Sequence, residues 1–137
     1  MEFYSHKQHA AIMSALNSDE SDPTRLEKFA VTSVKNACNK KHPGCLLITV
    51  LADATSFSTK FKDKLKEFVE ETDAAVADFI LQGIEAGELK PCANPELLAK
   101  VFVTALSGLA LRAGAGESEE DLMHIAKETV RTLFVHA

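Results

Sequence analysis

The stretch from residue 94 to residue 113 is apolar around almost its whole circumference when it is drawn as a helix. Asn94 is the predicted N-cap, and Pro95 follows at the first helical position, where its missing N–H costs nothing. The apolar positions are Leu97, Leu98, Val101, Phe102, Val103, Ala105, Leu106, Leu109, Ala110 and Leu111. A helix on the surface of a small domain shows one apolar stripe, so this helix requires cover on more than one side.

A second helix is predicted over residues 118–135, after a tight turn at residues 113–116 that contains two glycines. Ser118 is its N-cap, and Asp121 three residues later makes a variant of the capping box. Its apolar positions form one stripe at helical spacing. A chain this short is not expected to bury both helices completely, so we expect the helix pair to pack against a second copy.

The composition is that of an ordinary globular protein. The 137 residues are enough for one domain with a core, and 46% are hydrophobic and 26% charged. The net charge of −5 excludes a chain built to coat a polyanion. No unbroken apolar run approaches the roughly 18–20 residues of a membrane span, and the first residues do not resemble a signal peptide. Three widely spaced cysteines make no disulfide framework or zinc motif, which favours a cytoplasmic location.

The rest of the chain also favours helices. Residues 45–54 could form a buried strand by composition, but no second strand candidate is available to pair with it. A long helix is predicted to end at Gly87, which suits the C′ position. We therefore predict an all-α fold of about six helices, at residues 5–17, 23–38, 45–54, 56–86, 94–113 and 118–135.

Three segments together resemble one protein family. They are PGCLL at residues 43–47, AGEL at residues 86–89 and ALSGLAL at residues 105–111. In their order and spacing they resemble the C-terminal ligand-binding and dimerisation domain of the tetracycline-repressor (TetR) family of bacterial transcriptional regulators. The resemblance covers roughly residues 3–135.

The resemblance implies a division of the chain and a function. Residues 1–17 would be the helix that connects to a DNA-binding module, and residues 18–137 the ligand-binding and dimerisation domain. The family's helix-turn-helix does not occur in this chain, so operator DNA would be contacted only through a module outside it. The expected function is effector sensing and dimerisation in a cytoplasmic repressor, with no cofactor and no membrane partner.

The resemblance also implies a homodimer held by a four-helix bundle. The two helices at 94–113 and 118–135 would meet their two-fold copies. Small residues would permit close approach, and larger apolar residues would supply contact area. The expected interface residues are Ala105, Ser107, Gly108, Leu109, Leu111, Ile125, Val130 and Leu133.

In this family the helices surround a cavity, and a mostly apolar cavity with a few polar groups is typical of small-molecule sites. Three interior polar residues, Ser33, Thr49 and Thr72, are available to orient a small apolar effector. The expected lining residues are Phe29, Ser33, Cys45, Thr49, Phe68, Thr72, Phe79, Phe102 and Leu106.

Several alternatives stay open at the level of sequence. Cys45, near a helix start, is either a reactive sensor or a small apolar filler. His6 and His9 have a spacing that metal ligands use, but no third ligand is nearby. No catalytic constellation is visible, so we expect no enzyme. The main alternative function is a stand-alone helical small-molecule-binding or adaptor protein without DNA-binding activity.

Overall fold

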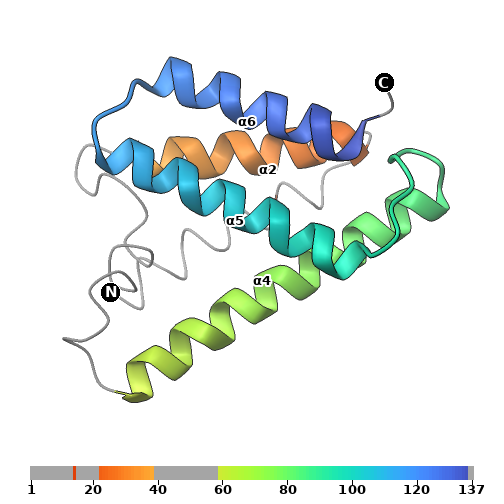
Figure 1. Ribbon diagram of the computed structural model, residues 1–137, viewed down its shortest axis with the longest axis horizontal. Coiled ribbons are helices and arrows are strands. Elements are labelled where there is room, and N and C mark those ends of the chain that lie inside the picture. The colour runs from red at the N-terminus through yellow and green to blue at the C-terminus, as the bar shows by residue number, and fades with distance from the viewer. Residues whose placement is uncertain (1–13, 15–21, 39–58, 136–137) are drawn as a thin grey trace.

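The computed structural model describes residue 14, residues 22–38 and residues 59–135. In this part of the chain there are four helices and no strand. They are α2 (Asp22–Ala37), α4 (Thr59–Glu85), α5 (Pro95–Gly114) and α6 (Glu119–Phe134) (Figure 1). The all-α prediction is confirmed for these four helices. The predicted helices at 5–17, apart from helical Ser14, and at 45–54 lie outside the described residues.

Both predicted N-caps of the last two helices are confirmed. The Leu97 N–H donates to Asn94 Oδ1 at 3.1 Å, and the Asp121 N–H donates to Ser118 Oγ at 3.2 Å. Each bond satisfies one of the amides that the first turn of a helix leaves without an intrahelical acceptor. These caps fix where α5 and α6 begin.

The ends of α4 and α5 depend on glycines with positive φ. Gly87 has φ 78°, and the next residue, Glu88, donates its N–H to Gly83 O at 2.9 Å. Gly116 has φ 95°, and the next residue, Glu117, donates its N–H to the carbonyl of Arg112 at 3.1 Å. These are Schellman motifs, in which glycine adopts a left-handed conformation at little cost. The predicted C′ role of Gly87 is confirmed.

Helix α5 is central, because it packs against α2, α4 and α6. Figure 1 shows it crossing between α4 on one side and α2 and α6 on the other. Phe102 at its middle is fully buried, with its ring centroid 5.8 Å from that of Phe29 and 5.0 Å from that of Phe134. The sequence prediction that this helix needs cover on more than one side is confirmed.

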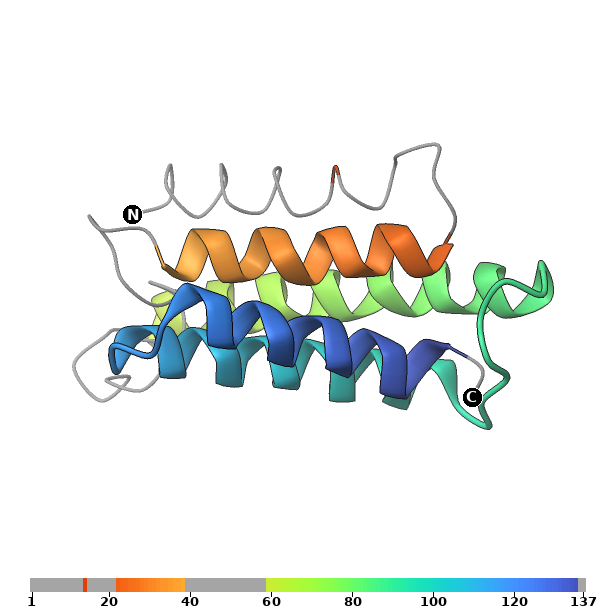
Figure 2. The same cartoon turned by 90° about the horizontal axis from the view of Figure 1, so that it is seen from above.

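The connection between α4 and α5 crosses the ends of other helices. The Lys90 N–H donates to Phe134 O at 2.8 Å, and Lys90 Nζ donates to Thr132 O at 2.9 Å. Both carbonyls belong to the last turn of α6. Figure 2 shows this connection, the beginning of α2 and the end of α6 at the same end of the molecule.

Candidate dimerisation surface

Helix α5 leaves one apolar side uncovered although three helices pack against it. Leu97, Val101 and Leu111 have 57%, 47% and 58% of their surface exposed. With Thr104 and Gly108 they recur every three or four residues, so they lie on one side of the helix. We call these five residues the α5 face. Large exposed apolar side chains gathered on one side are typical of a surface that binds another molecule.

Helix α6 adds apolar residues from its neighbouring edge. Ile125 is exposed, and Thr129 and Leu133 follow it at intervals of four residues and are half-buried. The opposite edge of α6, which carries Lys127 and Arg131, faces α2. Because α5 and α6 pack against each other, the Ile125 row lies beside α5 on the edge turned away from α2.

The middle of the α5 face carries the small residues Thr104 and Gly108, and Ser107 lies next to Gly108 in the sequence. A Cβ atom built on Gly108 would meet no atom within 4 Å, so the space above this residue is open. Ser107 Oγ donates to Val103 O at 3.0 Å, so its hydroxyl is already satisfied within the helix. A second helix could therefore approach closely here without leaving this polar group unpaired.

The structure divides the predicted interface residues into two groups. Leu111 and Ile125 are exposed, and Ala105, Ser107, Gly108 and Leu133 are half-buried. Leu109 and Val130, in contrast, are buried in the core of the chain itself. The predicted interface, including these two residues, stays a prediction. The sequence alone did not single out Leu97 and Val101 as exposed, because α5 is apolar in almost every direction.

The residues predicted to line an effector pocket are spread over the core. Phe29, Phe102 and Leu106 are buried, and the first two are in ring contact. Phe68, Thr72 and Ser33 are half-buried, and Cys45 and Thr49 lie outside the described residues. Ser33 Oγ donates to Phe29 O and Thr72 Oγ1 to Phe68 O, each at 2.9 Å. Phe79 is half-buried, and the centroid of its ring lies 5.7 Å from the Arg25 guanidinium carbon. The effector pocket therefore stays a prediction.

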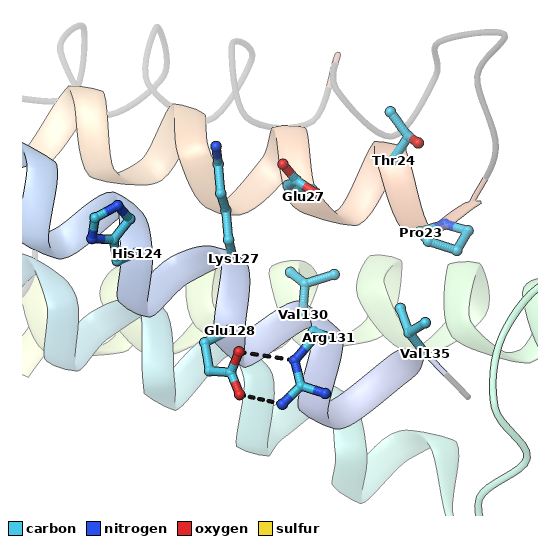
Figure 3. A pocket seen from close by; sticks show the side chains of 9 residues that line it. All are labelled: Pro23, Thr24, Glu27, His124, Lys127, Glu128, Val130, Arg131 and Val135. Atoms are coloured by element: carbon cyan, nitrogen blue, oxygen red, sulfur yellow. Dashed lines mark hydrogen bonds and ion pairs between the residues drawn. The ribbon is translucent and has the colours of Figure 1, made fainter. Parts of the chain in front are cut away.

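A groove that the sequence did not predict lies between α2 and α6 (Figure 3). It encloses about 510 Å³. Its lining residues are Pro23, Thr24, Glu27, His124, Lys127, Glu128, Val130, Arg131 and Val135. Glu128 and Arg131 form an ion pair, and this pairing lowers the pKa of the Glu128 carboxyl. The two acidic and two basic side chains offset each other, so the groove has no charge preference for a ligand.

The Cys38 thiol is not activated. Burial raises the pKa of Cys38, and the nearby charge of Glu119 raises it further. A raised pKa reduces the thiolate fraction, and the thiolate is the reactive form. Cys92 is half-buried and free. Within the described segments, no group of three His, Cys, Asp or Glu side chains is placed to hold a metal ion.

Among the described helices, only α5 is long enough and apolar enough to cross a membrane. Core helices of globular proteins share this composition. The burial of Phe102 and its contacts with α2, α4 and α6 mark α5 as a core helix with one uncovered side.

The described residues thus define an all-helical domain with one apolar side left uncovered. The chain belongs to the family "Tetracyclin repressor-like, C-terminal domain", whose pattern matches residues 23–129. This confirms the resemblance inferred from the three sequence segments. No curated protein is similar enough to count as a match.

Solved structures of TetR regulators share the fold. A triple cysteine mutant of the TetR family regulator CifR, complexed with 26-bp operator DNA, has a TM-score of 0.79 and 19% identity. The alignment covers 95% of this chain and 68% of that one. A TetR regulator from Chloroflexus aurantiacus has a TM-score of 0.81 and 14% identity, with 96% and 67% covered. At these identities the likeness shows the fold alone.

Proposed function

We propose that this chain is the effector-sensing and dimerisation part of a TetR-like repressor and that it dimerises through the α5 face and the Ile125 row of α6. The observation that carries this proposal is the exposure of Leu97, Val101 and Leu111 on a helix that already packs against three others. Burying apolar surface of this kind stabilises association by roughly 25 cal/mol per Å² before the costs of association are subtracted.

The proposed dimer is isologous, so each α5 face meets the same face of the other copy. The two-fold axis would pass near Gly108 and Thr104, where small side chains let the helices come close. Leu97 and Leu111 would then lie on either side of the axis, and the α6 helices would complete a four-helix bundle. This arrangement buries the residues that the single chain leaves exposed.

The proposed effector is a small apolar molecule bound among the interior residues of α2, α4 and α5. An effector that contacts α4 would change the relative stability of two positions of this helix against α5. In a regulator with a DNA-binding module, such a shift changes the separation of the two DNA readers. CifR is complexed with operator DNA, and the corresponding DNA partner of this chain is proposed on that likeness.

The dimer surface is tested by a pair of matched charge substitutions. Val101 on α5 is 47% exposed and Leu81 on α4 is 46% exposed, so both can accept aspartate without burying a charge in the folded chain. We expect Val101→Asp to convert the dimer to a monomer, and Leu81→Asp to leave it unchanged, in light scattering coupled to size-exclusion chromatography. A Val101→Asp chain that remains dimeric would contradict the proposed surface.

Effector binding is tested separately, with 1-anilinonaphthalene-8-sulfonate as a fluorescent probe. We expect saturable binding to the folded wild-type chain, and the same binding to the Leu81→Asp variant, because Leu81 lies on the exposed side of α4. Competition by small apolar molecules would then identify the effector class. Fluorescence that rises without saturation would argue against an interior pocket.

A further inference from the structure

The side-chain amide of Asn36, in the last turn of α2, differs from the other described polar groups. Its Nδ2 is buried and has no hydrogen-bond partner in the part of the chain that the structure describes. The amide nitrogen carries two N–H donors, and a buried donor without an acceptor lowers the stability of a folded chain. Buried polar groups in native proteins are nearly always paired, so this amide indicates an acceptor from another molecule.

The position of Asn36 on α2 shows which way the amide points. Asn36 follows Phe29 by two helical turns, so both side chains leave the helix in nearly the same direction. Phe29 faces α5, with its ring centroid 5.8 Å from that of Phe102. Ser33 lies on the same side, and its hydroxyl donates to Phe29 O at 2.9 Å. The amide of Asn36 therefore faces the interior of the helical domain.

The same side of α2 meets α4 near the beginning of α2. A Cβ atom built on Gly83 of α4 would be 2.8 Å from Asp22 Oδ2. One turn along α2, the guanidinium carbon of Arg25 lies 5.7 Å from the ring centroid of Phe79. Figure 1 shows α4 running away from α2 from there toward its own first residue. Asn36 lies near the other end of α2, on the side where the two helices have separated.

The charges on this side of α2 are already paired. Arg25 Nη1 lies 3.8 Å from Asp22 Oδ1. Lys35, next to Asn36 in the sequence, is exposed. An ionised ligand would lose its hydration here without gaining a free opposite charge. A neutral carbonyl oxygen needs only a donor, which Asn36 Nδ2 supplies.

We propose that Asn36 Nδ2 donates a hydrogen bond to the effector, and that the effector is a neutral apolar molecule with a carbonyl oxygen, such as a ketone, ester or lactone. This inference rests on the proposed effector-sensing function and narrows its ligand from any small apolar molecule to one with a hydrogen-bond acceptor. The predicted pocket residues did not include Asn36, because asparagine is most often a surface residue. The bound carbonyl would satisfy the buried donor.

The wild-type chain is tested first, by NMR of the Asn36 side-chain amide with two probes. Acetophenone and ethylbenzene are similar in shape, but only acetophenone carries a carbonyl oxygen. We expect acetophenone to shift the Asn36 amide protons downfield, because a hydrogen bond to a carbonyl oxygen deshields them. Ethylbenzene should cause no such shift. The measurement uses the intact fold, so it does not depend on the stability of any variant.

Asn36→Leu tests the same contact by displacement of N-phenyl-1-naphthylamine, an uncharged fluorescent dye that is larger than both probes. Leucine is similar in size to asparagine but has no donor. We expect the variant to bind acetophenone about three- to tenfold more weakly relative to ethylbenzene than wild type does, the effect of one net hydrogen bond. Gln82→Leu is the matched control, because Gln82 is an exposed amide on α4. It should keep the wild-type ratio.

Thermal unfolding without ligand gives a further readout that a structural amide would not give. Asn36→Leu removes a buried unpaired donor, so we expect its Tm to exceed that of wild type by at least about 2 °C. A lower Tm would show that the amide stabilises the chain itself and would overturn the proposal.

The outcomes separate this inference from the proposed function. If the uncharged dye binds saturably but acetophenone neither displaces it nor shifts the Asn36 amide, the role of Asn36 is overturned and effector sensing stands. An unchanged ratio of the two probes in Asn36→Leu has the same meaning. If neither this dye nor 1-anilinonaphthalene-8-sulfonate binds saturably, the interior pocket and the role of Asn36 fail together. Saturable binding of the sulfonate alone would overturn the neutral ligand class.

Discussion

Gly83 shows how a single missing side chain determines a helix junction. Replacing glycine with alanine inside a helix usually stabilises it by roughly 0.5–1 kcal/mol. Here the new methyl group would lie 2.5 Å from Leu89 Cδ1, and this leucine is buried, so it must shift against its neighbours. We expect Gly83→Ala to lower the free energy of unfolding by about 1–3 kcal/mol in urea titrations.

The companion variant Leu89→Ala tests whether the clash with Leu89 causes the loss of stability in Gly83→Ala. It removes the atoms that the new methyl group would meet, so Gly83→Ala should cost less in the Leu89→Ala background than in wild type. Equal costs in both backgrounds would show that Leu89 is not the source of the strain.

Gly108 is the opposite case, because the space above it is open in the single chain. We expect Gly108→Leu to fold with an unchanged circular-dichroism spectrum, since its Cβ would meet no atom within 4 Å in the chain. In the proposed dimer the same side chain would overpack the contact between the two α5 helices. Light scattering should then report a monomer or an aggregate, and an unchanged dimer would show that the contact lies elsewhere.

At the scale of the helix, the cap of α5 is a single hydrogen bond with a measurable effect. Asn94→Ala removes the acceptor of the Leu97 N–H and should lower the free energy of unfolding by about 1 kcal/mol. Asn94→Asp retains an acceptor and should stay close to wild type. Urea midpoints at one fixed protein concentration would check both variants, and an unchanged midpoint for Asn94→Ala would show that α5 does not depend on its cap.

The helix signals in the sequence were local, and they predicted the elements well. Asn94, Ser118 and Gly87 perform the capping roles that their types and positions indicate. The orientation of α5 about its own axis was not predictable in this way. An apolar residue such as Leu109 and an apolar residue such as Val101 look alike in the sequence, and only packing against α2, α4 and α6 distinguishes them.

At the scale of the molecule, contacts between residues distant in sequence were the least predictable. Nothing in the local pattern around Asp22 points to Gly83, because their contact depends on the assembled ends of α2 and α4. The groove between α2 and α6 was missed for the same reason. The sequence did predict that α5 would keep an uncovered apolar side, since a helix that is apolar all round requires more cover than one small chain supplies. It did not predict which residues form that side.

Dimerisation through this side also predicts how stability depends on concentration. If two folded chains associate and unfolded chains do not, each tenfold rise in protein concentration stabilises the dimer by about 1.4 kcal/mol. The Tm of the wild-type chain should therefore rise with concentration in scanning calorimetry. Leu81→Asp should show the same rise, because Leu81 lies on α4 and is not part of the α5 face. Val101→Asp should unfold at one temperature at every concentration, because a charge placed between the two α5 helices would keep the folded chains apart. A wild-type Tm that is independent of concentration, together with a monomeric mass, would mean that the exposed side of α5 binds something other than a second copy.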